Sequence, residues 1–537
     1  MTSIADQPAM RSPISGLGVI VMAAGLGKRM KSNHVKVLHQ VAGQPMVLYA
    51  VDVALRVGGH RIAVVVGHQA EKVRQVIEAG ITGKPGAHVV GIVEQTQQLG
   101  TGHAVMQSRP VFSHDGEVRP EYYLILNGDT PLLQESTVRE LLTIHQREGA
   151  TVTILTAILD DPSGYGRVIR RDMSQGDQVN PSSDVLKIVE DRDATSAERA
   201  SKEINVGTYV VSGAFLFDAL DKLEPDNAQG EYYLTDIVRM AVAQGQRVAA
   251  VMLQNPDEGL GVNTRQQLAE AEQVVRQQIR ERWLDAGVTM RDPGSVWIDA
   301  GVTIGKDTVL YPNVSLEGKT DIGEGAMIRS GVRITDCTIG DNVEILDHCV
   351  LRESRVEAEA HLGPFAHLRP GAIMRRKAKI GNFVEMKKAE LGEGSKANHL
   401  TYLGDARIGK GVNIGAGTIT VNYDGVNKHQ TVIENHVSVG SDTQLVAPVT
   451  IGEGAVIAAG TTVTQNVPAD SLAIARVPQA NRIGWAAKRR ALVERSISGV
   501  SSVKIPAKPV TAKTQKASAK AKRQNPRRSS SGRIVKR

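Results

Sequence analysis

The sequence predicts an α/β domain with a mostly parallel sheet, followed by an all-β parallel β-helix of hexapeptide repeats and a disordered basic tail. Three observations support this fold class. Apolar runs alternate with helical patterns up to about residue 260, an apolar ladder of period six follows, and the last stretch is rich in Lys, Ala, Ser, Pro and Arg. The chain has 537 residues, which is enough for several domains.

The first part predicts a sheet covered by helices. Strand-like runs rich in β-branched residues are "LGVIVMAAG", "HRIAVVVGH", "AHVVGIVEQ", "YYLILNGDT" and "TVTILTAIL". Helical patterns such as "PMVLYAVDVALRVGG" and "QAEKVRQVIEAG" lie between them. This alternation favours parallel strands, whose carboxyl ends form the ligand crevice.

Residues 264–286 predict one amphipathic helix that links the two folded parts. Apolar residues such as Leu268, Ala271 and Val275 recur on one side, and Gly287 is a suitable stop.

Beyond Val296 the apolar residues recur every six positions, with glycine after several of them. They are Ile304, Leu310, Leu316, Ile322, Ile328 and Ile334, and the ladder resumes at Val439. This period fits neither a helix nor a simple strand, and it is typical of a parallel β-helix. The polar stretch "VNYDGVNKHQTV" (421–432) predicts a loop that protrudes from one coil.

The net charge of +7 arises in the tail. Residues 501–537 hold twelve of the 64 basic residues and no acid, so the rest of the chain carries −5. A stretch of this composition cannot bury a core. It has no aromatic residue for stacking on bases, so we expect a solvated extension rather than nucleic-acid binding.

These patterns predict the following organisation: a flexible N-terminus (1–16), a nucleotidyltransferase domain (17–263), a linker helix (264–290), the β-helix (291–490) and the disordered tail (491–537). The two cysteines make a disulfide framework or a cysteine zinc site unlikely on sequence grounds. The N-terminus lacks the apolar segment of a signal peptide, and no run is long enough for a membrane span. We therefore expect a cytoplasmic protein without membrane contact.

The stretch "VIVMAAGLGKRM" (19–30) predicts a strand that enters a glycine loop. Backbone N–H groups in such a loop can cradle an anion, and Lys28, Arg29 and Lys36 add positive charge. Taken alone, "AAGLG" fits an ordinary strand–helix turn with solvated lysines equally well.

Two further motifs favour nucleotide chemistry. "QTQQLGTGHA" (95–104) is a second glycine turn, in which Gln95 can hydrogen-bond a base edge. "LNGDTP" ends a strand with Asp129, a residue type that often binds Mg²⁺ in phosphoryl-transfer sites. Together, the three motifs predict a nucleotidyltransferase.

Residues 17–490 resemble a known enzyme family in the order and length of their motifs. These include Gly25, Gly27, Arg29 and Met30 before Lys36-Val37-Leu38, then "EQTQQLGTGHA", "NGDTPL", "GYGRVIR", "EINVGTY" and "GVNTRQQL". The family is that of sugar-1-phosphate nucleotidyltransferases, and the attached hexapeptide part narrows it. The chain is similar to the bifunctional N-acetylglucosamine-1-phosphate uridylyltransferases/glucosamine-1-phosphate N-acetyltransferases, which combine a Rossmann-like domain with a left-handed β-helix.

The resemblance implies roles in a uridylyl-transfer site that uses UTP and Mg²⁺. Residues along the triphosphate path would be Met22, Ala23, Ala24, Gly25, Gly27, Arg29 and Lys36. Gln95, Gly100 and Thr101 would read uracil, Asn127 and Gly128 would support the nucleotide, and Asp129 and Asn263 would hold Mg²⁺. Gly166, Glu190 and Asn205 would hold N-acetylglucosamine. Met22 and Asn127 replace the Leu and Tyr that relatives often have.

The resemblance also implies an acetyl-transfer site in the β-helix. His399 would be the general base and Glu385 would orient it. Glucosamine-1-phosphate would be bound by Arg369, Lys387, Tyr402, Asn413, Asn422 and Tyr423. Acetyl-CoA would contact Ala416, Asn422, Tyr423, Ser441, Ala459 and Arg476. If three repeats close one coil, residues 18 apart stack, which pairs Arg369 with Lys387 and Ser441 with Ala459.

In the family this site lies between subunits, so a homotrimer is implied. The product, UDP-N-acetylglucosamine, supplies peptidoglycan and other cell-envelope polymers. Two alternatives remain open at this point. One is a monofunctional nucleotidyltransferase with a non-catalytic β-helix, and the other is a structural hexapeptide assembly.

Overall fold

The computed structural model describes residues 16–25, 27–113, 119–172 and 183–499. The predicted flexible N-terminus, apart from Gly16, and most of the predicted basic tail lie outside these ranges. The side chain of Lys28 is also outside the described part.

The N-terminal domain is built on a nine-stranded sheet whose main order is β11-β7-β10-β6-β1-β4-β5. The bounds are β1 Leu17–Ala23, β4 Arg61–Val66, β5 Val90–Glu94, β6 Tyr122–Asn127, β7 Val152–Ile158, β10 Glu203–Ser212 and β11 Val248–Met252. Strands β8 (Arg167–Arg170) and β9 (Val185–Val189) extend it from β10. The pairs of β1 with β4 and β6, β4 with β5, and β7 with β11 are parallel, whereas β10 is antiparallel to both neighbours. The predicted strands and the mostly parallel sheet are confirmed.

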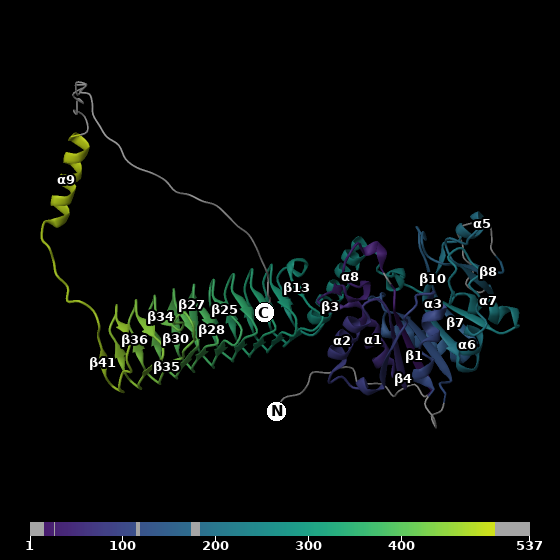
Figure 1. Ribbon diagram of the computed structural model, residues 1–537, viewed down its shortest axis with the longest axis horizontal. Helices are drawn as coiled ribbons and strands as arrows, with labels where there is room; N and C mark the ends of the chain where they lie inside the picture. The colour runs from purple at the N-terminus through teal and green to yellow at the C-terminus, as the bar shows by residue number, and fades with distance from the viewer. Residues whose placement is uncertain (1–15, 26, 114–118, 173–182, 500–537) are drawn as a thin grey trace, which may run out of the picture. The chain divides into compact units, whose positions relative to one another are not determined.

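Helices cover both faces of this sheet (Figure 1). One face packs against α1 (Met46–Val57), α2 (Ala70–Ile81) and α4 (Glu135–Glu148). The other packs against α3 (Thr101–Met106), α6 (Gly213–Leu220) and α7 (Asp236–Ala243). A short helix, α5, spans Ser196–Arg199. Because both faces are buried, the central strands are apolar along their whole length, as expected for parallel strands.

The linker helix α8 runs from Arg265 to Asp285. It begins with a capping box, in which the Thr264 side chain accepts from the Gln267 N–H and the Gln267 side chain accepts from the Thr264 N–H. The end of the helix is followed by Gly287, which has φ of +89° and whose N–H donates to the Leu284 carbonyl. Ala271, Val275 and Ile279 are buried and join the first coils of the β-helix in one core.

The β-helix has three sheets whose short strands follow one another around each coil (Figure 1). One sheet runs from β12 (Thr289–Met290) to β41 (Leu472–Ala473), the second from β13 (Trp297–Ile298) to β40 (Thr462–Val463), and the third from β14 (Thr303–Ile304) to β38 (Val449–Ile451). All pairs between their strands are parallel, and the predicted apolar ladder fills the interior. The predicted β-helix is confirmed.

The number of residues per coil is not constant. Thr303 pairs with Asp321, 18 positions on, whereas Met327 pairs with Glu344, 17 positions on. The loop at 422–430 lengthens one coil, so that Ala406 pairs with Thr431, 25 positions on. The rule that residues 18 apart stack therefore holds where Arg369 and Lys387 lie, but it is wrong for many other coils. A corner can lose one residue or extrude a loop as long as the next strand resumes its register.

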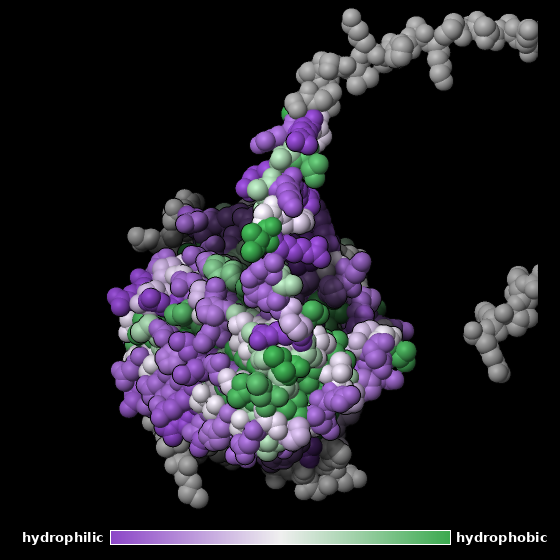
Figure 2. Space-filling view, turned by 90° about the vertical axis from the view of Figure 1, so that its left-hand side faces the viewer, coloured by the Kyte–Doolittle hydropathy of each residue, from purple (hydrophilic) through white to green (hydrophobic). Residues whose placement is uncertain are grey.

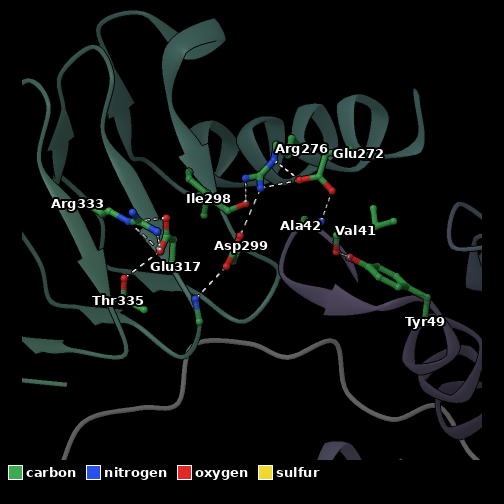
Figure 3. A network of polar contacts seen from close by, with 11 residues as sticks. Val41, Ala42, Tyr49, Glu272, Arg276, Ile298, Asp299, Glu317, Arg333 and Thr335 are labelled. Atoms are coloured by element: carbon green, nitrogen blue, oxygen red, sulfur yellow. Dashed lines mark hydrogen bonds and ion pairs between the residues drawn. The ribbon is translucent and has the colours of Figure 1, made fainter. Parts of the chain in front are cut away.

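A network of polar contacts joins the hairpin β2–β3 (Gln40–Val41, Gln44–Pro45), α8 and the first coil (Figure 3). Arg276 donates to Glu272 (2.6 Å) and to the Ile298 carbonyl (3.3 Å), and it lies 3.5 Å from an Asp299 carboxylate oxygen. Its guanidinium also stacks 4.4 Å above the centre of the Trp297 ring. Glu272 accepts from the Ala42 N–H (2.6 Å), so one arginine connects three segments.

Beyond the last coil, residues 485–499 form helix α9 (Trp485–Gly499). The predicted start of the disordered tail at residue 491 was therefore wrong, because residues 491–499 continue this helix. Three Ala and one Leu at high helix propensity, with only one glycine at its end, account for the helix. Within the described ranges, no helix combines the length and the apolar character needed to cross a membrane.

Figure 2 looks onto the C-terminal end of the β-helix, where apolar side chains gather. Among the exposed residues near this end are Leu472 and Ile474, which are 65% and 58% exposed. Leu472 pairs with the outward-facing Val456, whereas Ala473 pairs with the buried Ile457, so Ala473 ends the interior ladder in the described part of the chain.

The Arg276 network yields a stability prediction. Arg276→Ala would leave two partly buried carboxylates, Glu272 and Asp299, without their cation, and we expect a loss of about 2–4 kcal/mol. Urea unfolding followed by circular dichroism measures the shift. Arg333→Ala is the matched control, because Arg333 also pairs with a carboxylate, Glu317 (2.9 Å), but is 62% exposed. It should cost no more than about 1 kcal/mol. Equal effects of the two variants would contradict the role given to Arg276.

Candidate active sites

The glycine loop follows β1, the strand that pairs with β4 on one side and β6 on the other. Gly27 has φ of +63°, and a Cβ atom there would lie 2.5 Å from the Lys36 Cβ. Only glycine therefore allows both this backbone conformation and the close approach of Lys36. The loop holds Lys36 against the end of the sheet.

Three distant segments meet at this end of the sheet. Asp129 follows β6, Asn263 precedes the cap of α8, and the Lys36 ammonium lies between them. It forms a short ion pair with the Asp129 carboxylate and donates to Asn263 Oδ1 at 3.1 Å. The Asp129 carbonyl accepts from the Val262 N–H (2.9 Å), which fixes the two segments to each other. The predicted metal ligands thus converge, and they already hold a cation.

The oxygen donors at this point fit the predicted Mg²⁺. Asp129 and Asn263 offer a carboxylate and an amide oxygen, which are hard ligands of the kind that Mg²⁺ prefers. No cluster of three or more His, Cys, Asp or Glu able to hold a metal occurs in the part of the chain that the structure describes. A site with two protein ligands suits Mg²⁺, because this ion usually keeps several waters and binds substrate phosphates.

A cavity of about 890 Å³ opens over these residues. It is lined by fourteen of the residues predicted for this site: Met22, Ala23, Ala24, Gly25, Gly27, Arg29, Lys36, Gln95, Gly100, Thr101, Asn127, Asp129, Glu190 and Asn263. The predicted Gly128, Gly166 and Asn205 lie behind this lining. The Gly128 N–H donates to the Met22 carbonyl (2.9 Å), and the Asn205 N–H donates to the Gly166 carbonyl (2.8 Å).

Sequence reasoning missed several lining residues: Gln98, Gly164, Asp191, Arg192, Gln229 and Glu231. Gln98 is part of the motif "QTQQLGTGHA", and its side chain donates to the Ala24 carbonyl of the glycine loop (2.9 Å). Reasoning from the residues also missed Arg167, which is buried and pairs with Asp191 (3.2 Å). The signal available in the sequence was an arginine directly before the apolar residues of a strand-like stretch, "GYGRVIR".

The second glycine turn is fixed to the segment 231–234. Gly100 has φ of +108°, and a Cβ there would lie 2.7 Å from the Tyr232 carbonyl oxygen. The Thr101 hydroxyl accepts from the Leu234 N–H at 3.0 Å. Gln95 is 4% exposed, and its side-chain nitrogen donates to the Gly100 carbonyl at 3.1 Å. The three residues predicted to read the base therefore form one rigid wall.

Glu190, Asp191 and Glu231 add acidic groups to the cavity lining, beside Arg192. Glu190 is largely buried and accepts from the Thr235 hydroxyl at 3.2 Å. Burial raises the pKa of the Glu190 carboxyl, and the neighbouring Asp193, Asp236 and Asp191 raise it further. A carboxyl of this kind binds neutral hydroxyl and amide groups well, and it repels phosphates.

In the β-helix, one corner forms a column of five residues from consecutive coils. His399 stacks on Asn382, and its carbonyl accepts from Gly417 N–H, so that Ala416 follows in the next coil. Asp442 N–H donates to the Ala416 carbonyl (2.7 Å) and Gly460 N–H to the Ser441 carbonyl (2.8 Å), which continues the column through Ser441 to Ala459. Adjacent coils are about 4.8 Å apart. The column therefore places small residues in line beyond His399 over roughly 14 Å.

The structure corrects the partner of His399. Its Nδ1 lies 3.0 Å from Asn382 Oδ1. Glu385, predicted to orient His399, instead accepts from the Arg369 guanidinium at 2.7 Å. Asn382 was missed because it lies 17 residues before His399, a spacing set by the short coil.

Cations gather at the far end of the strands that carry Glu385. Arg369 and Lys387 lie in adjacent coils, and Lys428 reaches them from the protruding loop. Contact with the Lys428 ammonium, and the nearby Arg369 charge, lower the pKa of Lys387. Three like charges held together favour a bound anion. Arg369 and Lys387, both predicted to bind glucosamine-1-phosphate, therefore lie together with Lys428.

The remaining predicted residues lie on several coils of the β-helix. Tyr402 pairs with Glu385 in the sheet, and its hydroxyl lies over Gly404, where a Cβ would be 2.3 Å away. Asn422 is buried and donates to Asp405, which sequence reasoning missed. Tyr423 is exposed in the loop, Asn413 pairs with Ser438 on a different sheet, and Arg476 donates to the Ala459 carbonyl.

Comparison with known proteins agrees with this arrangement. Residues 18–301 match the family model "Nucleotidyl transferase", residues 293–389 match "GMPPB C-terminal domain", and residues 430–465 match "Bacterial transferase hexapeptide (six repeats)". A protein named "Bifunctional protein GlmU" from Pelobacter propionicus is 48% identical over 473 residues, covering 88% of this chain and 98% of the relative. The chain belongs to the GlmU family.

Two further GlmU relatives show the same extent of similarity. The protein from Trichlorobacter lovleyi is 49% identical over 474 residues (88% of this chain, 98% of the relative). The protein from Geobacter sulfurreducens is 48% identical over 497 residues (89% of this chain, 100% of the relative). The predicted bifunctional enzyme, a uridylyltransferase joined to an acetyltransferase, is confirmed at the level of the family. The monofunctional and the purely structural alternatives are set aside.

The contact of His399 with Asn382 yields a prediction. Asn382→Ala removes the oxygen that holds the imidazole, so acetyl transfer should slow by about 10- to 100-fold. Thiol release from acetyl-CoA measures the rate. Asn382→Asp, which keeps an acceptor, should retain most of the activity, and uridylyl transfer should be unchanged in both variants. Full acetyl transfer in Asn382→Ala would contradict the role of this contact.

Proposed function

We propose that the N-terminal cavity binds UTP, Mg²⁺ and N-acetylglucosamine-1-phosphate, and that the β-helix acetylates glucosamine-1-phosphate with acetyl-CoA. The convergence of Lys36, Asp129 and Asn263 under the glycine loop carries the first part of this proposal. A phosphate-binding loop, hard oxygen donors and a cation meet at one point, as transfer of a nucleotidyl group requires.

In this site the sugar-phosphate oxygen attacks the α-phosphorus of UTP. The bond from that phosphorus to the bridging oxygen breaks, and pyrophosphate leaves with the electron pair. Backbone N–H groups of the glycine loop, with Arg29 and Lys36, stabilise the charge on the leaving group. Asp129 and Asn263 would hold Mg²⁺, which supplies further neutralisation of phosphate charge when it is bound. No side chain needs to act as a nucleophile.

Base and sugar contact different lining residues of the cavity in this proposal. Gln95, Gly100 and Thr101 form the rigid wall for uracil. Glu190, whose carboxyl is protonated more readily than usual, faces the hydroxyl and acetamido groups of the sugar, with Gly166 and Asn205 behind it.

In the β-helix, the contact with Asn382 sets the proton positions of His399. Asn382 Oδ1 can only accept, so Nδ1 of His399 carries the proton and Nε2 is left as the base. Nε2 takes a proton from the sugar amine as that nitrogen attacks the acetyl carbonyl. The C–S bond then breaks and the CoA thiol leaves.

In this proposal the two substrates contact two different parts of the β-helix surface, the cation cluster and the column of small residues. Arg369, Lys387 and Lys428 bind the phosphate of the sugar, with Tyr402, Asn413, Asn422 and Tyr423 around the ring. The column of Ala416, Ser441 and Ala459 gives a smooth wall for the slender pantetheine arm, and Arg476 lies at its end. Glu385 acts through Arg369 in this chain, with which it forms an ion pair.

We also propose a homotrimer, because apolar residues next to His399 are exposed and could be covered by another subunit. Phe365 and Phe383 stack at 5.5 Å in adjacent coils, and both are about half exposed, as is Leu400 in the coil that follows. We further propose that the enzyme acts in the cytoplasm, where UTP and acetyl-CoA are made, and supplies precursor for peptidoglycan. Incubation with glucosamine-1-phosphate, acetyl-CoA, UTP and Mg²⁺ should yield UDP-N-acetylglucosamine by mass detection, and its absence would refute the proposal.

The metal ligands give the first test of the separate sites. Asp129→Asn removes the carboxylate charge, so uridylyl transfer should fall by roughly 10³-fold or more. Pyrophosphate release measures the rate, and acetyl transfer by the same preparation is the internal control. Normal formation of the UDP-sugar in this variant would refute the assignment of Asp129.

The proposed base gives the second test. His399→Ala removes the group that takes the amine proton, so acetyl transfer should fall by about 10²- to 10⁴-fold. Thiol release is the readout, and uridylyl transfer from supplied N-acetylglucosamine-1-phosphate should persist. Unchanged acetylation would show that another group accepts the proton.

A further inference from the structure

We propose that His103 is a positioning residue that sets the choice of pyrimidine, because it fixes which end of the Gln95 amide faces the nucleotide. This inference rests on the uridylyl transfer proposed above. His103 lies in α3, one turn after the glycine turn, and it does not line the cavity itself.

Gln95 has a defined orientation in the structure. Its Nε2 lies 3.1 Å from the Gly100 carbonyl oxygen and 2.9 Å from His103 Nδ1. A backbone carbonyl can only accept, so the atom at this place must be the amide nitrogen rather than the oxygen. Both N–H groups of the amide are then used, and Oε1 is the polar atom of this side chain that a ligand in the cavity can address.

The orientation also determines the state of His103. Because Gln95 donates to Nδ1, this ring nitrogen must be the acceptor, so the ring is neutral and its proton is on Nε2. Nε2 lies 3.2 Å from the side-chain nitrogen of Gln107. An amide can turn by 180°. The same reasoning would fix the Gln107 nitrogen at the His103 carbonyl, but a neutral ring has only one acceptor nitrogen, so the two orientations exclude each other. The contacts of Gln95 (2.9 and 3.1 Å) are shorter than those of Gln107 (3.2 Å each), so we assign Gln107 as the amide that turns, and its oxygen then accepts from Nε2–H.

An acceptor in the Gln95 position distinguishes uracil from cytosine. Uracil carries an N–H group at N3, whereas cytosine has a lone pair there. Oε1 therefore accepts from uracil and faces a second acceptor when cytosine is bound. If the amide turned, its nitrogen would suit cytosine instead. Gly100 alone can satisfy only one N–H of Gln95, so the second anchor, His103, makes the turned state costly.

The test compares UTP with CTP as substrates of the full-length enzyme, with N-acetylglucosamine-1-phosphate as acceptor. His103→Leu removes the acceptor, and we expect the ratio of kcat/KM for UTP over CTP to fall by about 10- to 100-fold. His103→Asn, whose Oδ1 can take the place of Nδ1, should restore the ratio to within a few fold. Gln107→Leu is the matched control, since it contacts the same ring from the other side and should leave the ratio near that of the wild type.

The outcomes distinguish failure of the role given to His103 from failure of the proposed function. If the wild-type enzyme forms no UDP-sugar from UTP, the proposed function fails. If it does, and His103→Leu keeps the wild-type ratio, the role of His103 is overturned. Equal loss in His103→Leu and His103→Asn would also overturn it, because it would show a packing effect rather than a hydrogen bond. Acetyl transfer in each variant confirms that the chain is folded.

Discussion

Most coils of the β-helix are stabilised by the coils before and after them, and the proposed acetyl-transfer site depends on this stacking. A coil closes when its three strands are joined by tight corners, several of which need a left-handed backbone. Phe365, Phe383 and Leu400 adopt φ of +54°, +58° and +47° at one such corner. That conformation costs roughly 1–2 kcal/mol per residue, and hydrogen bonds between coils offset it. The same stacking places His399 above Asn382 and in line with the small residues beyond it.

The uridylyl-transfer site depends on a different constraint, the parallel alignment of strands. The carboxyl ends of β1, β5 and β6 meet at one edge, so the residues that follow each strand become neighbours. Asn263 also lies at this edge, because the Val262 N–H donates to the Asp129 carbonyl and the capped start of α8 follows directly. The same helix contributes Arg276 to the first coil of the β-helix. One helix thus begins beside the N-terminal cavity and packs against the first coils of the β-helix.

Much of this architecture could be predicted from the sequence. The strand pattern, the period of six and the glycine motifs are local properties, so the fold class and the linker helix follow from them, whereas most cavity residues were expected from the resemblance to the nucleotidyltransferase family. Contacts that depend on register could not be predicted in the same way. The Asn382 contact with His399 results from a coil that is one residue short, and the ion pair of Glu385 with Arg369 depends on how neighbouring side chains compete for partners. The α9 helix was missed because its composition resembles that of the tail that follows.

The loop at 422–430 shows how such a solenoid can change over evolution. It adds seven residues to one coil, yet the next strand resumes its pairing at Thr431 and the interior ladder continues without a gap. Loop length therefore varies independently of the scaffold, and closing a longer loop costs little free energy. Because this loop brings Tyr423 and Lys428 to the site, new acceptor preferences can be acquired by changing one surface insertion. The three-sided framework beneath it can stay the same while paralogues diverge.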